Sequence, residues 1–338
     1  MLKTTAINSP LPSEVYIKET VIDGKDVRLD CAKINGHAYS VSPGLVRVMS
    51  LEDDWCEDID DPATVIAALN NSDIRADLFT FWQRLPDLEP KYSYTMELDS
   101  IAALPIKSYS FWWEKQIERK ARNKVRKAQK KGVTVRMASF DDAFIRGMTS
   151  IFNETPIRQG RRFLHYGKNF ETIKRQFGRF LFREEIFGAY VGEELIGFIM
   201  VADAGNYALL GQIISKIAYR DLAPTNALLA KVVEYCAEKR FPYLVYAYWL
   251  DDSLGDFKRS NGFQKFDLPR YFVPLTSKGK LALKLGVHRG WKEAVPKPLR
   301  KTLKNLRRRW YDLHHRPINE CHSPPTRAER EFFHQEKL

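Results

Sequence analysis

The sequence predicts an α/β protein with a mixed central sheet flanked by helices. Short apolar runs typical of strands alternate with longer stretches whose apolar residues recur every three to four positions. From Val133 onward the predicted order is one strand, two helices, three strands, a helix, a strand, a short helix and a final strand pair. Turn residues stand where these elements should end, such as Gly132 and the Gly192-Glu193 pair. Few folds combine elements in this order.

The first hundred residues predict a small α/β unit. Residues 27–34 and 37–41 alternate like strands around an Asn35-Gly36 turn, a strong hairpin signal. Asp61-Pro62 predicts the start of a helix. Residues 77–85 are expected to be helical and residues 92–98 to form a strand.

Residues 110–131 predict one long helix that Gly132 ends. Its apolar stripe has i, i+4 spacing, and lysines and arginines occupy much of the remaining surface. This cationic face is either an ordinary solvated surface or a surface that meets phosphates. The elements predicted after it are strand 133–137, helices 141–154 and 170–182, strands 186–191, 195–202 and 207–215, helix 224–240, strand 243–248, helix 254–260 and a strand pair around 266–273.

Composition argues against several classes of protein. No apolar stretch approaches the roughly 18 residues that a membrane span needs, and residues 1–13 lack the apolar segment of a secretory signal. The four cysteines form no C-x-x-C pair and have no histidines at metal-ligand spacing. We therefore expect a cytoplasmic protein without a disulfide framework and without a metal site.

Charge is distributed very unevenly along the chain. Residues 1–100 carry 9 Lys/Arg and 18 Asp/Glu, with seven of the acids between Glu52 and Asp61. Residues 114–136 carry 10 bases and 2 acids, and residues 278–316 carry 13 bases and 2 acids. Because the excess of basic charge is local, an anionic partner should be met locally too.

Three segments resemble the GNAT acyltransferase superfamily. The hairpin IFGAYVGEELIGFIMV resembles its second and third strands, and ALLAKVVEYCAEKRFPYLVY resembles its third helix and fifth strand. DFKRSNGF resembles the FYEKLGF-like ending of acetyltransferases, with Lys258 where many of them have a tyrosine. The predicted element order is also that of the GNAT fold.

The resemblance is closest to the Fem-type branch, which transfers aminoacyl groups from aminoacyl-tRNA. The Phe257-Lys258 pair, the basic segment ERKARNKVRKAQKKGVTV and the loop NETPIRQGRRFLHYG are similar to segments of those proteins. The resemblance covers roughly residues 90–275. We expect a degenerate GNAT-like half in residues 1–110, a transferase domain in 111–275 and, outside the transferase pattern, a basic helical tail in 276–338. The resemblance also implies that an arginine and a tyrosine of this loop approach the acceptor. We assign acceptor binding to Arg158, Arg161 and Tyr166 of the loop, and to Tyr248 from its place at the end of a predicted strand.

The segment expected to bind the donor departs from the acetyltransferase pattern. Acetyl-CoA users have a glycine-containing loop whose backbone amides approach the pyrophosphate, whereas RDLAPTNALL, residues 220–229, has no glycine. The helix N-terminus can still attract an anion through its free amides and dipole. We assign donor binding to Arg220, Thr225 and Asn226, together with Gln212 and Phe257, and rank an aminoacyl or other carrier-linked donor above acetyl-CoA.

Acyl transfer to an amine needs a proton acceptor, stabilisation of an oxyanion and a proton for the leaving group. We assign these catalytic roles to Lys258, Tyr246 and His165. Each has a structural alternative: an exposed lysine on a short helix, a core tyrosine and a satisfied loop histidine. Strand alternation is expected to place Tyr246 and Tyr248 on one face.

The predicted function is an N-acyltransferase that moves an acyl or aminoacyl group from acyl-CoA or aminoacyl-tRNA to an amine, with a diphosphate or carboxylate as a possible further feature of the acceptor. Two rivals stay open. One is a non-catalytic GNAT-fold module that binds an anionic membrane or nucleic acid. The other is an acetyl-CoA-dependent acetyltransferase of small amines.

The tail predicts a basic amphipathic helix. Its apolar positions recur at helical spacing at Leu299, Leu303, Leu306, Trp310 and Leu313. Such a helix suits the inner face of an anionic membrane, RNA phosphates, or the acidic N-terminal half of the chain itself.

The membrane alternative predicts that the full chain sediments with anionic liposomes and that deletion of residues 278–338 abolishes this binding. Co-sedimentation with anionic and with neutral vesicles measures it. Unchanged binding after the deletion contradicts the membrane interpretation.

Overall fold

The computed structural model describes residues 14–22, 25–158, 161–178 and 181–288. The chain divides into two units: residues 1–156 with 164–294, and residues 157–163 with 295–338. The predicted helix in residues 299–313 lies outside the described residues. In the small unit, β8 (Ile157–Arg158) pairs with β9 (Arg161–Arg162).

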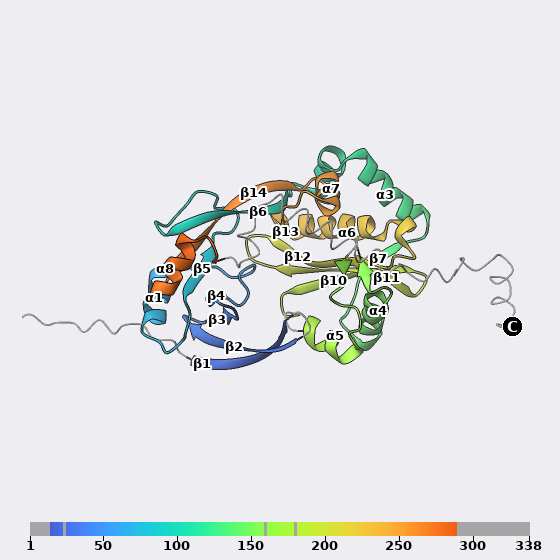
Figure 1. Cartoon of the computed structure of the whole chain (residues 1–338). Helices are drawn as coiled ribbons and strands as arrows, with labels where there is room; N and C mark the ends of the chain where they lie inside the picture. Colours follow the sequence, from blue (N-terminus) through green and yellow to red (C-terminus); the bar gives the residue numbers. More distant parts are fainter. Residues whose placement is uncertain (1–13, 23–24, 159–160, 179–180, 289–338) are drawn as a thin grey trace, which may run out of the picture. The chain divides into compact units, whose positions relative to one another are not determined.

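The large unit is built on a sheet of twelve strands (Figure 1). Their order is β1-β2-β3-β4-β5-β14-β6-β13-β12-β11-β10-β7. The strands are β1 (Glu14–Ile22), β2 (Lys25–Ile34), β3 (His37–Ser42), β4 (Val48–Leu51), β5 (Leu78–Trp82), β6 (Thr95–Pro105), β7 (Thr134–Met137), β10 (Glu184–Val191), β11 (Glu194–Asp203), β12 (Ala208–Ser215), β13 (Tyr243–Tyr248) and β14 (Gln264–Pro274).

This order is that of two similar halves joined back to back. In each half four strands pair antiparallel, and the fourth has a parallel neighbour reached through a helix: β4-α1-β5 and β12-α6-β13. The last strand of each half is exchanged. Strand β6 pairs with β13, strand β14 pairs with β5, and β6 and β14 pair with each other. The predicted tandem of GNAT-like halves is thereby confirmed.

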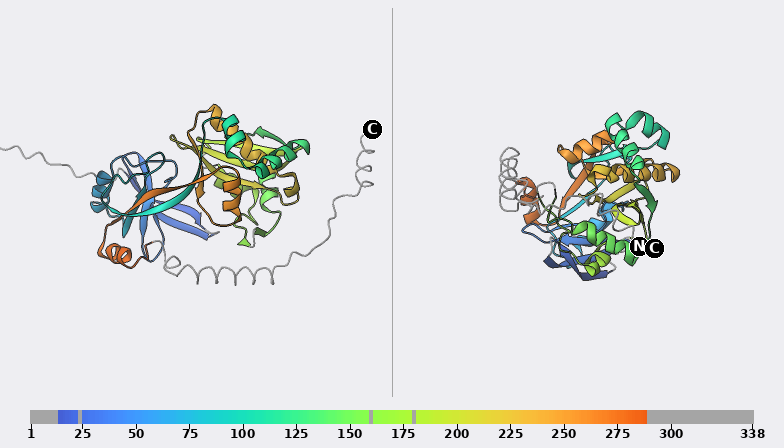
Figure 2. Two further views of the ribbon diagram at one scale, coloured as in Figure 1. Left: turned by 90° about the horizontal axis from the view of Figure 1, so that it is seen from above. Right: turned by 90° about the vertical axis from the view of Figure 1, so that its right-hand side faces the viewer.

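Helices cover both faces of the second half, as the two views in Figure 2 show. Helix α6 (Pro224–Glu238) and helix α3 (Arg119–Lys130) share one core with Phe187 and Val201. We call this side the α6 face. Helix α4 (Asp142–Phe152) packs on the other side, where Phe144 and Phe152 meet Phe198. We call that side the α4 face; α5 (Phe170–Phe177) lies against α4.

The remaining helices are short. Helix α1 (Pro62–Asn70) starts as predicted, with Asp61 as its N-cap. Helix α7 (Ser253–Ser260) joins β13 to β14, and α8 (Ser277–Lys284) contacts β14. Because α8 and its contact with β14 belong to the described fold, the liposome test needs a deletion that begins after residue 288 rather than at residue 278. Among the helices described, none is long and apolar enough to cross a membrane.

Three sequence predictions are wrong in detail. Residues 78–82, predicted helical, form strand β5. All five of its side chains are buried, so both faces of the strand are covered. The predicted long helix is interrupted: α2 (Tyr109–Phe111) leads into a π-helix, Trp112–Gln116, and Ile117 is extended before α3 begins. The predicted final strand pair is the single strand β14.

The interruption has a tertiary cause. Trp112 is fully buried, and its indole N–H donates to the carbonyl of Asn261 over 2.8 Å. Arg122 donates to the carbonyls of Glu114 and Ile117, which caps the end of the π-helix. The contact of Trp112 with Asn261 joins residues that are 149 positions apart, so helical periodicity does not report it.

We expect Asp99→Asn to lower the free energy of unfolding by about 3 kcal/mol, because it leaves the buried guanidinium of Arg270 without its main counter-charge. Arg270 Nε donates to Asp99 over 2.5 Å across the β6–β14 pair. Urea denaturation measures the loss. Asp267→Asn is the control, since its exposed pair with Lys265 contributes at most about 1 kcal/mol. Equal effects of the two changes would contradict the assignment.

Candidate active site

Strands β12 and β13 separate after only two paired positions. Ala208 pairs with Leu244 and Leu209 with Val245, and no further partners follow among the described residues. Both strands are irregular where they part. Strand β12 carries an extra residue at Gly211, because Leu210 faces Val201 while Gln212 faces Met200. Beyond Leu209 and Val245 the two described strands are no longer hydrogen-bonded to each other; we call this place the β12–β13 opening.

The irregularity in β13 changes which face its tyrosines occupy. Ala247 has a φ of 47°, a left-handed conformation that is strained for alanine. Tyr246 packs on the α6 face, 5.9 Å from the ring of Phe263. Tyr248 packs on the opposite face, 5.3 Å from the ring of Trp55. The prediction that alternation places both on one face is therefore wrong, because the bulge shifts the register by one residue.

Lys258 holds this bulge in place. Its side chain is buried, and Nζ donates to the carbonyls of Tyr246 over 2.6 Å and Tyr248 over 2.7 Å. These carbonyls flank Ala247, so one ammonium group satisfies the backbone groups that the bulge removes from the sheet. Nζ also lies 4.3 Å from the centre of the Tyr246 ring. Burial lowers the pKa of Lys258 to about 8, although Asp252 acts in the opposite direction.

Two of the three predicted catalytic residues lie together at the opening. Lys258 and Tyr246 meet at the α6 side of the opening, and the partly buried Phe257 packs against the same core. Burial raises the pKa of Tyr246, so its hydroxyl is protonated at neutral pH. Their catalytic roles stay predictions.

The predicted donor segment lies on the α6 face except for one residue. Arg220 is exposed in a short 3₁₀ turn, Arg220–Leu222, and Ala223 then adopts a left-handed φ of 54° before α6 begins. Pro224 has no amide hydrogen, and the amides of Asn226 and Ala227 both donate to the carbonyl of Ala223. Few amides therefore remain to hold an anion at this end of α6, with that of Thr225 the best placed.

Gln212 lies on the other side of the sheet. It pairs with Met200, which alternates with Ile199 and Val201 of the α6-face core. Gln212 therefore shares the α4 face with Tyr248, away from Arg220, Thr225 and Asn226. The extra residue at Gly211 produces this placement.

His165 is packed rather than exposed. Its ring stacks on Phe152 at 4.6 Å, and Nδ1 lies 3.1 Å from Nζ of Lys168. Burial, and secondarily Lys168, lowers the pKa of His165 to about 4, so the ring is neutral at pH 7. Tyr166 beside it is exposed. Arg158 and Arg161 belong to the small unit, where the guanidinium of Arg158 lies 5.0 Å from the ring of Phe163.

Sequence reasoning missed two residues on the α4 face. Glu184 is half-buried near the opening, with Oε1 3.6 Å from where a Cβ on Gly211 would lie. Burial, and secondarily Asp53, raises the pKa of Glu184 to about 7. Trp55, which contacts Tyr248, comes from the acidic loop of the first half, residues 52–61. The sequence offered one signal for Trp55: it is a large aromatic residue within a strongly acidic segment.

Arginines from distant elements hold the acidic loop. Arg183 binds Asp53 and Glu57, Arg84 binds Asp58, and Arg270 reaches Asp54. The hydroxyl of Tyr207 also donates to the carbonyl of Trp55 over 2.6 Å. The loop of the first half is therefore part of the wall of the second half's site.

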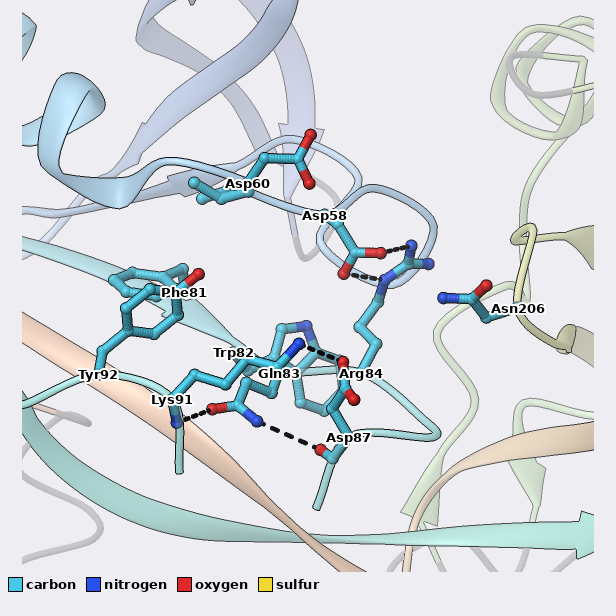
Figure 3. Close-up of a pocket in the computed structure, with 11 residues that line it drawn as sticks. Asp58, Asp60, Phe81, Trp82, Gln83, Arg84, Asp87, Lys91, Tyr92 and Asn206 are labelled. Carbon is cyan, nitrogen blue, oxygen red and sulfur yellow. Dashed lines mark hydrogen bonds and ion pairs between the residues drawn. The ribbon is translucent and has the colours of Figure 1, made fainter. Parts of the chain in front are cut away.

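A separate polar cavity of about 220 Å³ is lined by residues of the first half and by Asn206 of the second (Figure 3). Arg84 and Asp58 form an ion pair in its lining, and Gln83 bonds to the backbone of Asp87 and Lys91. None of the predicted site residues lines it. Among the described residues, no group of three His, Cys, Asp or Glu side chains is arranged to hold a metal ion.

Residues 115–253 match the family model of the acetyltransferase (GNAT) domain. The matched segment, which contains strands β10 to β13 and the β12–β13 opening, is a GNAT domain of the acyltransferase class. A search of curated proteins finds no match.

Solved structures with a similar course of the chain include FemX, with 13% identity, 81% of this chain and 91% of that chain covered, and a TM-score of 0.49. L-PGS from Bacillus licheniformis has 13% identity, 75% and 86% coverage and a TM-score of 0.49. A tandem GNAT protein from the clavulanic acid biosynthesis pathway has 14% identity, 78% and 85% coverage and a TM-score of 0.37.

We expect Lys258→Met to lower the free energy of unfolding at pH 7 by about 1–3 kcal/mol, because two buried carbonyls lose their donor. The folded-state pKa of about 8 lies below the ordinary value of 10.5. The unfolded chain therefore binds the proton more tightly, and wild type gains stability over the variant as the pH rises from 8 towards 10.5.

Urea denaturation at pH 7 and pH 10 measures both effects. Lys265→Met, an exposed change on β14, is the control. A difference between wild type and Lys258→Met that does not vary with pH would contradict the assignment.

Proposed function

We propose that the chain transfers an acyl or aminoacyl group from a carrier to an amine at the β12–β13 opening. The observation that carries this proposal is that the strands part at the opening, with Tyr246 and Lys258 on the α6 face there and Tyr248 and Glu184 on the α4 face. A carrier-bound acyl group that enters from the α6 face then meets an amine that enters from the α4 face. Because both reactants are then bound in one complex, the transfer becomes an effectively unimolecular step.

The donor that the site favours is an aminoacyl or other carrier-linked acyl group rather than acetyl-CoA. Close binding of a pyrophosphate needs several free amides in succession. At the start of α6, Pro224 has none, and Asn226 and Ala227 donate to Ala223. The exposed Arg220 supplies a charge for phosphate, and Thr225 supplies an amide. The sequence resemblance to Fem-type proteins supports the same ranking.

Lys258 takes a positioning role in this proposal. Its ammonium group binds the carbonyls on both sides of Ala247, so it sets where Tyr246 and Tyr248 lie at the opening. Gln212 and Tyr248, both on the α4 face, would contact the acceptor. Arg158, Arg161 and Tyr166 remain proposed acceptor-binding residues through the sequence resemblance alone.

A thermal-shift screen tests the donor. We expect a deacylated tRNA pool to raise Tm more than acetyl-CoA or longer acyl-CoAs do, and to do so less at high salt because phosphate contacts release counterions. Arg220→Gln should reduce the shift, whereas Arg146→Gln, an exposed change on α4, should not.

The outcomes separate the candidates. A larger shift with acetyl-CoA, lost in Arg220→Gln, would reverse the donor ranking. No shift with any donor would favour a non-catalytic binding module.

A further inference from the structure

We propose that Glu184 accepts the proton of the acceptor amine at the β12–β13 opening. This inference rests on the proposed acyl transfer and names the group that activates its nucleophile. Glu184 is the first residue of β10, two strands away from β12, and no sequence motif singles it out.

The register places Glu184 on the α4 face. It pairs with Ala202, which pairs with Leu209, the last residue of β12 that is bonded to β13. Its neighbour Glu185 points to the α6 face, because Phe187, two residues further on, packs against Tyr235 of α6. Glu184 therefore lies in the row of residues at which the opening starts.

The bulge in β12 leaves room for its carboxylate. Gly211 is exposed, and Oε1 of Glu184 lies 3.6 Å from where its Cβ would be. Any side chain longer than a methyl group at position 211 would compete with the carboxylate for this space. Because the extra residue at the point where the strands part is glycine, the carboxylate of Glu184 can extend from β10 to the opening.

The surroundings leave Glu184 available for proton transfer. Among the described residues no hydrogen bond or ion pair engages its carboxylate. The charged groups that face it are Asp53 of the acidic loop and Arg183 beside it, and Arg183 is itself held by Asp53 and Glu57. Burial and Asp53 raise the pKa of Glu184 to about 7 and Arg183 opposes this, which places its titration near neutral pH, where a general base works best.

The step balances as follows. The acceptor enters as an ammonium ion, R–NH₃⁺, and the Glu184 carboxylate takes one of its protons. The nitrogen lone pair then forms the N–C bond to the acyl carbonyl. The bond from that carbon to the carrier's oxygen or sulfur breaks, and this leaving atom receives the second proton that the nitrogen loses. The products are an amide, the free carrier and protonated Glu184.

Glu184→Gln tests the inference, with Glu185→Gln as the matched control one residue away on the other face. With the donor that the thermal-shift screen selects and the primary amines n-butylamine, L-lysine and tyramine as acceptors, we expect kcat/KM to fall about 100-fold in Glu184→Gln. We also expect the rise of wild-type kcat/KM through pH 7 to disappear in this variant. Glu184→Asp should restore part of the rate, and Glu185→Gln should keep the wild-type profile.

A measurement without turnover keeps the test independent of the donor. Because the raised pKa makes the folded state hold the proton more tightly, wild type loses stability as the pH rises from about 4.5 through 7. Glu184→Gln should therefore raise Tm at pH 8 by about 2–4 °C and by less at pH 5. At pH 8 tyramine should raise the Tm of wild type and of Glu185→Gln, but not that of Glu184→Gln.

The two proposals fail in different ways. Wild type that transfers no acyl group with any donor contradicts the proposed function. Active wild type together with a Glu184→Gln variant of equal rate and unchanged pH profile overturns the role of Glu184. Stabilisation by tyramine that is equal in wild type and Glu184→Gln, or absent from wild type, overturns it as well.

Discussion

The pairing of β6 with β14 is the constraint on which the rest of the structure depends. Each is the last strand of its half, and each also pairs with the fifth strand of the other half. This exchange makes one sheet of twelve strands from two similar halves, and the buried pair of Arg270 with Asp99 lies across it. A buried charge is costly without its partner. The pair therefore favours this register of β6 and β14 over registers shifted by one or more residues, and so determines which residues of the two halves meet.

The exchange also gives the first half a part in the second half's site. With the two halves joined, the acidic loop of residues 52–61 reaches the α4 face, where Trp55 contacts Tyr248 and Asp53 approaches Glu184. The acids of this loop are matched by Arg84, Arg183 and Arg270 of the described chain. The first half is therefore more than a degenerate copy, because it supplies charge and an aromatic side chain beside the β12–β13 opening.

Two local irregularities connect this framework to chemistry. The left-handed Ala247 turns Tyr248 to the face opposite Tyr246, and the ammonium group of Lys258 stabilises the strained backbone between them. The extra residue at Gly211 makes room for Glu184. Both lie where β12 and β13 part, so the positions at which the sheet loses hydrogen bonds are those at which we propose that substrates bind. Backbone irregularities of this kind are common next to active sites.

The sequence alone determined the class of fold, most element positions in the second half and the segments that resemble GNAT proteins. Local rules were sufficient there: strand alternation gave β13 its bounds, and turn glycines such as Gly132 ended helices where expected. They failed for β5, whose apolar run is buried on both faces, and for Lys258 of α7, whose burial depends on a bulge in strand β13. The sequence did not predict Glu184 as a site residue either, because its burial beside Gly211 also depends on the tertiary structure. Only the tertiary structure decides which backbone carbonyls are left without partners and which carboxylates leave water, because both depend on strands that pair across large separations in sequence.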